Sequence, residues 1–423
     1  MRFPIITFGT HGDVRPYVAL AQGFKRAGHE AFVVTDASFR EFVEGNGVGF
    51  KPLNCDVRKM LEIIGGRDLA HRGNRPFSFF REVKRQVLPL TEELFRDTLA
   101  ACEDMDAVLF GAIGGISASH IAEKLGVPAI GVSLQPYTPT RQIMSPLSPM
   151  FGKITMGGLF NRMSYEAVSA VSWQIFRKAV NNARASVLGL PPESGSHRIW
   201  DGKLAKMPMV YGFSEHVFPR PREWGDWVHI AGYWFLDDNS APQDEVAEFV
   251  NRDGEVIYIG FGSMNIAEPE RLFRSLSSVI KAEGIRAVIS RGWGFAGDFE
   301  SDENIHFCDY VPHDWLFPRM SAVVHHAGAG TTAGAIRAGT PSVAVPFVVD
   351  QFLWADRLYR LGLAPKPLSW KRFSHASFAK SISEVLSNSK YRETARHYQS
   401  LITAEDGIAN AVNWMVERLT GGR

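Results

Sequence analysis

A glycine-rich segment between two apolar stretches carries the residues with the clearest chemistry. Residues 326–330 read HAGAG and follow an apolar run centred on Val323, which predicts a buried strand. Thr331 opens a predicted short helix, and Gly339 ends it. Backbone N–H groups at a helix start have no intrahelical partner, and that end of the dipole is positive. The pattern predicts an anion site to which His326 and Thr331 add side-chain donors.

Two polar side chains follow the next predicted strand, at residues 342–347. Asp350 and Gln351 come after this strand, and open α/β sheets bind their ligands at the carboxyl ends of strands. A carboxylate accepts hydrogen bonds and an amide also donates them, which suits sugar hydroxyls. Gly328 and Gly330 would let the main chain approach a diphosphate. Similar glycine-rich turns also occur in α/β proteins that bind no phosphate.

The N-terminal segment has a second loop with reactive side chains. A predicted strand at residues 3–8 precedes the loop Gly9–Asp13, and a helix is expected to begin near Pro16. His11 or Asp13 could remove a proton from an attacking hydroxyl. From local sequence alone, Asp13 could instead be the N-cap of the helix.

The order of these parts resembles the donor-binding signature of the inverting, nucleotide-sugar-dependent glycosyltransferases of family 1. The resemblance is to the bacterial and sterol-type branch. It is carried by VPHDWLFPR at residues 311–319, HHAGAGTT at 325–332 and DQ at 350–351. Ala327 stands where many relatives carry glycine, and we expect its methyl group to be tolerated. The opening GTHGDVRPYVALAQGFKRAGHE, at residues 9–30, is similar to that of the sterol and glycopeptide glycosyltransferases.

The resemblance implies an α/β protein of the GT-B type, with two Rossmann-like domains facing each other across a cleft. It implies a UDP-sugar co-substrate, with glucose expected, and inverting transfer with no metal and no resident cofactor. Gly262 and Ser263 would lie over the diphosphate. Tyr310 would stack on the uracil, and the Val311 backbone would read the base edge.

The resemblance also bears on the catalytic base. In macrolide-type relatives the histidine that aligns with His11 is the base, paired with an aspartate after the strand at residues 107–110. Gly111 stands at that aspartate position here. In the glycopeptide and sterol branch, the aspartate that aligns with Asp13 is the base. We therefore favour Asp13, with His11 assisting or orienting.

The chain of 423 residues is long enough for two domains. A proline- and tryptophan-containing stretch without periodicity places the boundary near residue 222. Residues 1–222 would bind the acceptor, residues 223–405 would bind the nucleotide sugar, and a final helix in 406–423 would cross back to the first domain. The proline- and methionine-rich segment 135–159 is interpreted as a wall of the acceptor pocket.

Composition limits the classes of function. A net charge of +1 argues against nucleic acid as a partner, and three widely spaced cysteines indicate a reducing compartment without a zinc site. With neither a signal peptide nor a membrane-spanning segment recognised, a cytoplasmic location is expected. Residues 56–86 interleave basic and aromatic side chains. This segment could form an acceptor-side flap or contact a membrane, but a solvated basic loop is favoured over membrane contact.

Several alternatives stay open. The acceptor is expected to be a lipophilic molecule with a hydroxyl group, of sterol, polyketide, hydroxy-lipid or flavonoid type. A dTDP-deoxysugar could replace UDP-glucose as the donor. A UDP-sugar epimerase shares the GT-B fold, and a nucleotide-sugar-binding protein without activity is a further alternative. An NAD-dependent oxidoreductase is disfavoured because the residues after Gly262 lack the GxGxxG pattern. The oligomeric state is left open.

Overall fold

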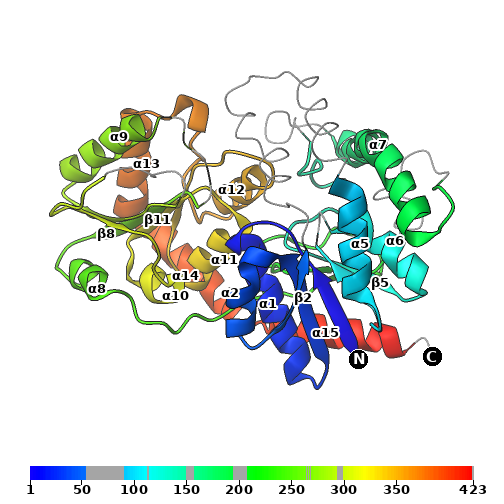
Figure 1. The fold of residues 1–423 in the computed structure, drawn as a ribbon. Coiled ribbons are helices and arrows are strands. Elements are labelled where there is room, and N and C mark those ends of the chain that lie inside the picture. Colours follow the sequence, from blue (N-terminus) through cyan, green and yellow to red (C-terminus); the bar gives the residue numbers. More distant parts are fainter. Residues whose placement is uncertain are drawn as a thin grey trace.

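A computed structural model describes residues 1–53, 90–111, 114–148, 157–193, 207–262, 264, 266, 268–292 and 299–421. The chain folds around two separate parallel sheets, which lie in the two halves of the molecule (Figure 1). The sheets confirm the prediction of an α/β protein with two Rossmann-like domains. Ser263 and the basic–aromatic segment 56–86 lie outside the described residues.

The first sheet has seven parallel strands in the order β3-β2-β1-β4-β5-β6-β7. Their bounds are β1 (Arg2–Ile6), β2 (Glu30–Asp36), β3 (Gly49–Leu53), β4 (Val108–Phe110), β5 (Ala129–Ser133), β6 (Met209–Tyr211) and β7 (Val228–Ile230). The helices of this half are α1 (His11–Arg26), η1 (Ala37–Phe39), α2 (Arg40–Gly45), α5 (Thr91–Cys102), α6 (Gly115–Leu125), α7 (Gly158–Ala183) and the π-helical turn η4 (Arg184–Leu188). One apolar cluster joins α1 to one face of the sheet, and a second joins α5, α6 and α7 to the other.

The second sheet has five parallel strands in the order β10-β9-β8-β11-β12. Their bounds are β8 (Val256–Gly260), β9 (Arg286–Ser290), β10 (Ile305–Cys308), β11 (Ala322–His325) and β12 (Ser342–Ala344). The helices are α8 (Asp244–Val250), α9 (Pro269–Ala282), α10 (His313–Leu316), η6 (Phe317–Arg319), α11 (Ala329–Arg337), α12 (Gln351–Arg360), η7 (Trp370–Arg372), α13 (His375–Ser387), α14 (Ser389–Thr403) and α15 (Gly407–Thr420). Apolar clusters again cover both faces of the sheet.

The boundary between the two sheets differs from the prediction near residue 222. Strand β7 pairs in parallel with β6, so residues 228–230 belong to the first sheet. By sheet membership the division therefore falls after Ile230. The stretch at residues 219–227 was aperiodic because it is a connection between two strands of one sheet, not a linker between domains.

Helix α1 also begins earlier than predicted. Its first residue is His11, with Thr10 at the N-cap, so Pro16 lies inside the helix and not in its first turn. Proline removes one backbone donor from a helix, which normally signals a boundary. Here Thr10 and Asp13 form a capping box that starts the helix upstream of the proline.

The two halves share an apolar core. One cluster combines Tyr211 and Phe213 from the first half with Ala333 on α11 and Trp354 on α12. The rings of Phe213 and Trp354 meet edge to face, with centroids 5.7 Å apart. Helix α15 packs against α1 and β7, as predicted, and runs beneath the first half in Figure 1.

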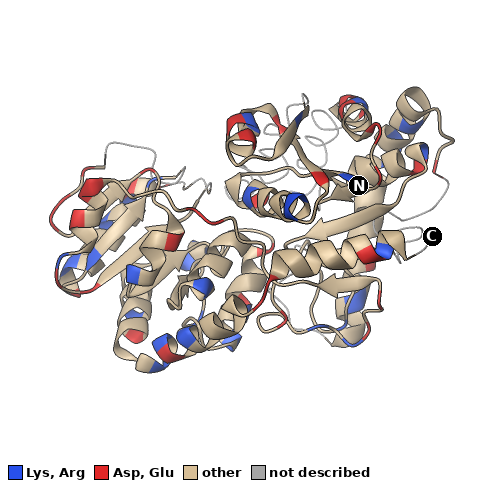
Figure 2. Cartoon of the chain, turned by 90° about the horizontal axis from the view of Figure 1, so that it is seen from below, with Lys and Arg blue, Asp and Glu red and all other residues tan. Residues whose placement is uncertain are grey.

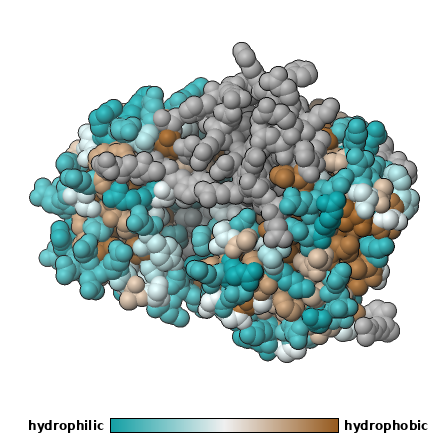
Figure 3. Space-filling view, in the orientation of Figure 1, coloured by the Kyte–Doolittle hydropathy of each residue, from teal (hydrophilic) through white to brown (hydrophobic). Residues whose placement is uncertain are grey.

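The surface is mixed in charge and uneven in hydropathy. Basic and acidic residues are both spread over the helices of the two halves (Figure 2). Among the described residues in the view of Figure 3, hydrophilic ones are widespread, and hydrophobic ones gather on the flank that carries α5 and α6. In the described part of the chain, no helix has both the length and the hydropathy to cross a bilayer.

Candidate active site

The glycine-rich segment forms the N-terminus of α11, as predicted, but the helix starts two residues earlier than expected. Gly328 is its N-cap, which places Gly330 and Thr331 in the first turn. The first intrahelical hydrogen bond runs from the Thr332 amide to the Gly328 carbonyl, at 2.9 Å. The amides of residues 329–331 therefore precede the helical ladder and point out of the helix start. They form the donor set that an anion site requires.

The His326 ring is held between two glycines. A Cβ on Gly328 would overlap the ring, and one on Gly262 would lie 3.1 Å from its Cε1 atom. Gly262 also has φ +58°, which favours glycine. Both glycines, which were predicted to lie close to a diphosphate, thus have the His326 ring as their nearest neighbour.

Buried polar atoms cluster around this helix start. Burial lowers the pKa of His326 to about 4, so its imidazole is neutral at pH 7. His326 Nδ1 and Thr332 Oγ1 are buried without a hydrogen-bond partner. Unsatisfied buried polar atoms call for an explanation, and a bound oxyanion is one that fits this site. Ala327 adopts φ +60°, so its methyl group is accommodated in a conformation that normally favours glycine.

Asp13 occupies the third position of α1. The Thr10 backbone N–H donates to Asp13 Oδ2 at 2.8 Å, and the Thr10 hydroxyl donates to the same oxygen at 3.2 Å. Burial raises the pKa of Asp13, and the hydrogen bonds from Thr10 partly oppose this rise. Asp13 thus has the capping role that local sequence allowed, at the N3 position and not as the N-cap. Both hydrogen bonds engage Oδ2, so Oδ1 takes no part in the cap.

His11 has a different environment. Its ring packs edge-on against Phe39 and Phe42, with centroids 5.0 Å apart in each case. Burial, and then the neighbouring Arg15 charge, lower the pKa of His11. Both effects disfavour the protonated imidazolium that a histidine base must become.

Gly111 has no room for the partner aspartate of the macrolide-type enzymes. A Cβ at this position would lie 2.8 Å from the hydroxyl oxygen of Tyr17. That hydroxyl is fixed by a 3.0 Å hydrogen bond to the Val132 carbonyl. A His11–aspartate pair with its carboxylate at residue 111 therefore does not fit this chain.

Asp350 faces the first half of the molecule. Its Oδ2 accepts a 3.1 Å hydrogen bond from the side-chain amide of Gln135, which follows β5. Burial raises the pKa of Asp350 to about 6; the Asp13 charge adds to the rise and Gln135 opposes it. The structure thus brings the predicted sugar-binding carboxylate into contact with the first half of the molecule, near enough to the predicted base for the Asp13 charge to raise its pKa.

The side chain of Gln351 hydrogen-bonds to the loop that precedes it. Its Oε1 accepts hydrogen bonds from the backbone N–H groups of Phe347, at 2.8 Å, and Val348, at 3.1 Å. Its Nε2 contacts Met264 Sδ at 3.3 Å. The side chain is buried and supports the loop that carries Asp350. Since its oxygen is already engaged, the predicted contact with sugar hydroxyls would have to be made by the amide nitrogen.

Tyr310 lies where the two halves meet. Its hydroxyl donates to Asp238 and accepts from Arg15 Nη1 at 3.3 Å. The Tyr310 side chain is largely exposed, whereas Val311 is buried in the second half. An exposed ring leaves a face for the predicted base stacking, and Arg15 of α1 connects it to the helix that carries Asp13.

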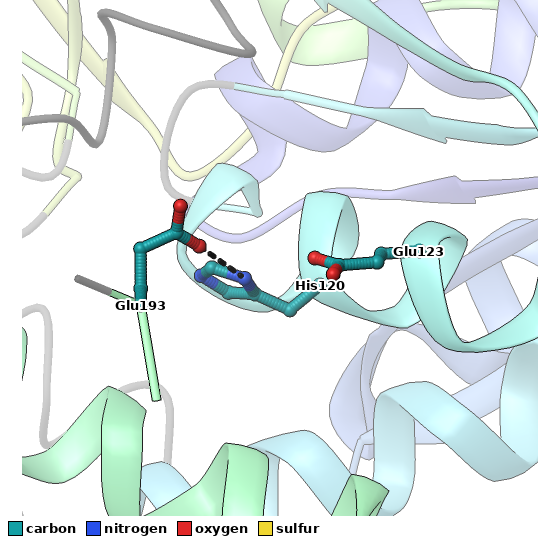
Figure 4. A group of neighbouring side chains, drawn as sticks. All are labelled: His120, Glu123 and Glu193. Carbon is teal, nitrogen blue, oxygen red and sulfur yellow. Dashed lines mark ion pairs between the residues drawn. The ribbon is translucent and has the colours of Figure 1, made fainter. Parts of the chain in front are cut away.

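One group of side chains has metal-ligand chemistry in the described residues. His120, Glu123 and Glu193 gather in Figure 4. The buried Arg184 guanidinium already fills their centre, with Nη1 2.8 Å from His120 Nδ1 and 3.0 Å from Glu123 Oε2. A metal ion would have to displace this charge, so the cluster is a buried ion network. It lies apart from Asp13 and Asp350.

Gln135 and Arg15 were missed as site residues. Gln135 follows a strand at the carboxyl edge of the first sheet, which is the signal that identified Asp350. Arg15 stands two residues after Asp13 in the motif, but nothing in its spacing shows that it reaches the other half of the chain.

Comparisons with known proteins identify the family of this chain. A profile of the glycosyltransferase family 28 N-terminal domain matches residues 3–144. The C-terminal domain of proteins like erythromycin biosynthesis protein CIII matches residues 300–416. Sterol 3-beta-glucosyltransferase UGT80B1 of Arabidopsis thaliana is 34% identical over 427 residues, which cover 98% of this chain and 67% of that protein. The chain belongs to the family 1 glycosyltransferases. The sterol 3-beta-glucosyltransferase of Pichia angusta is 30% identical, over 100% of this glycosyltransferase and 34% of the yeast protein.

Solved structures agree on the fold of the glycosyltransferase. The calicheamicin glycosyltransferase CalG4 has a TM-score of 0.69 at 18% identity, over 100% of this chain and 98% of that one. Glycosyltransferase VinC in complex with dTDP has a TM-score of 0.67 at 16% identity, over 100% of both chains. At these identities the likeness establishes the GT-B fold alone.

Proposed function

We propose that this glycosyltransferase moves glucose from UDP-glucose to a hydroxyl group of a lipophilic acceptor, with inversion and without a metal ion. The observation that carries the proposal is that the Asp13 charge acts on Asp350, which lies in the same half as the start of α11, where we place the diphosphate. One side of the cleft can thus take a proton, while the other holds a sugar and a leaving diphosphate. The names of the sterol glucosyltransferase relatives support a lipophilic acceptor and a β-glucoside product.

The reaction needs two events on opposite faces of the sugar. Asp13 takes the proton of the acceptor hydroxyl as its oxygen bonds to the anomeric carbon. The bond from that carbon to the diphosphate breaks on the far side, so an α-linked donor gives a β-glycoside. The amides at the start of α11, with His326 and Thr331, stabilise the charge that develops on the diphosphate. Asp350 and the Gln351 amide bind the sugar hydroxyls, and Tyr310 stacks on the base.

A dTDP-sugar is the second candidate donor. It is supported by two structural neighbours that were solved with thymidine diphosphate, VinC and SsfS6. Both nucleotides present a pyrimidine and a diphosphate, and the proposed site contacts these shared parts.

A thermal-shift titration with UDP, dTDP, GDP and NAD, with and without EDTA, tests the proposal. A rise in melting temperature with UDP that is insensitive to EDTA is expected, and the rise should be smaller in His326→Ala. A shift with dTDP alone would select the second donor. No shift with either pyrimidine nucleotide, or a shift with NAD, would contradict the donor site. Turnover of UDP-glucose with a panel of sterols and polyketides, followed by NMR of the product linkage, then tests the acceptor class and the inversion.

A further inference from the structure

Gln135 reaches from the acceptor half of the molecule to the carboxylate of the donor half. It is the second residue after β5, and its side-chain amide lies 3.1 Å from Asp350 Oδ2. The loop that begins here was expected to line the acceptor pocket. Its first residue instead contacts the carboxylate assigned to the donor sugar.

Local contacts fix how Gln135 is held. Ser133, at the end of β5, is buried, and its hydroxyl lies 3.1 Å from the Gln135 carbonyl oxygen and 3.5 Å from Gln135 Oε1. Since a carboxylate only accepts, the nitrogen of the Gln135 amide must face Asp350. The glutamine therefore directs its N–H group, a hydrogen-bond donor, toward the half of the molecule that is proposed to bind the nucleotide sugar.

The hydrogen bond from Gln135 helps to keep Asp350 ionised. Burial and the nearby Asp13 charge both disfavour the ionised carboxylate, and the Gln135 hydrogen bond favours it. A sugar hydroxyl that donates to Asp350 needs the ionised form. The neighbouring Tyr137, two residues further along the loop, also feels both carboxylates: burial, then Asp350 and other nearby groups including Asp13, raise its pKa.

We propose that Gln135 is a positioning residue for the donor sugar: its amide orients the Asp350 carboxylate and completes the sugar-hydroxyl subsite from the acceptor domain. The inference rests on the proposed function, because it assigns Asp350 to the sugar. UDP lacks the sugar, so Gln135 influences the affinity for UDP-glucose and not the affinity for UDP. A hydrogen bond to a charged group accounts for about tenfold in affinity.

Calorimetry with UDP-glucose and UDP tests this in wild type, Gln135→Leu and Gln142→Leu. Gln142 is an exposed glutamine of the same loop and serves as the matched control. Gln135→Leu should weaken UDP-glucose about tenfold and leave UDP unchanged, whereas Gln142→Leu should change neither. If Gln135 only held the two halves together, both ligands would weaken equally, and the inference would be overturned. An unchanged affinity for UDP-glucose would overturn it as well.

Gln135→Glu adds a readout that a purely structural role would not change. At pH 8 a glutamate here repels Asp350, so UDP-glucose binding should be weak. At pH 5.5 the two carboxyl groups can share a proton, which restores the hydrogen bond and the affinity, whereas Gln135→Leu should not recover. Equal weakness at both pH values would count against the proposal. A wild-type protein that binds neither UDP-glucose nor dTDP-glucose would contradict the proposed function itself, and the Gln135 inference with it.

Discussion

The carboxylate of Asp13 lies in the space that a side chain on Gly9 would fill. A Cβ at position 9 would overlap Asp13 Oδ2, and Gly9 itself has φ +145°. The glycine therefore allows the loop before α1 to close over the carboxylate, so that Thr10 can donate to it. A residue with no side chain thus controls where the proposed base stands.

Gly9→Ala should therefore impair catalysis more than donor binding. The methyl group must push the Asp13 carboxylate away, and a shift of about 1 Å at a reacting group can cost about 10²-fold in rate. We expect kcat to fall by roughly that factor while the Kd for UDP stays the same. Gly45→Ala is the control, because no atom lies within 4 Å of the added methyl group. A parallel loss of UDP affinity would show that the loop does more than position Asp13.

The choice between Asp13 and His11 is settled by two substitutions. Asp13→Asn keeps the shape and the hydrogen bonds of the cap but cannot take a proton, so kcat should fall by roughly 10²–10⁴ with donor binding intact. His11→Ala should have a smaller effect, because the ring packs between two phenylalanines and its pKa is lowered by burial and by Arg15. Near-normal turnover in Asp13→Asn would return the role of base to His11.

The sequence predicted most elements and the main parts of the site because these depend on local patterns. The strand–loop–helix at residues 321–338 is encoded by apolar runs and glycines within one short window. The interdomain contacts of Gln135 and Arg15 are different, since their partners stand 215 and more residues away in sequence. Strand β7 was assigned to the wrong half for a different reason: its partner β6 is close in sequence, but the pairing is set by packing and not by the residues of β7.

Two short sequence patterns were each compatible with two local structures, and only the structure distinguishes them. Pro16 favours a helix start, yet the Thr10–Asp13 capping box begins the helix upstream of it. Asp350 and Gln351 form one polar pair in sequence, but they point to different partners. Asp350 reaches Gln135 in the other half of the chain, whereas Gln351 closes its own loop.

Asp350→Asn should stabilise the protein at neutral pH while weakening UDP-glucose binding. The pKa of Asp350 is raised from 3.8 to about 6, so its charged form costs the folded state free energy above pH 6. Protonation removes this cost as the pH falls from 6 toward 3.8, so the gain in melting temperature should be largest above pH 6 and vanish below pH 4. Asp356→Asn, at a surface ion pair on the same helix, is the control. Thermal unfolding across this pH range checks the prediction, and a gain that persists at pH 4 would contradict it.

Val349→Gly should also stabilise the protein. Val349 adopts φ +46°, which is strained for a β-branched residue, and it immediately precedes Asp350. Gln351 Oε1 accepts hydrogen bonds from the backbone amides of Phe347 and Val348, the two residues before Val349, and this holds the loop in its conformation. The Val349 side chain is 43% exposed, so its removal loses little packing while the backbone strain, on the order of 1 kcal/mol, is relieved. Chemical denaturation should show a gain of about that size for Val349→Gly and a loss for Val348→Gly, whose φ is negative. A loss in both variants would mean that the valine side chain stabilises the loop more than its backbone strains it.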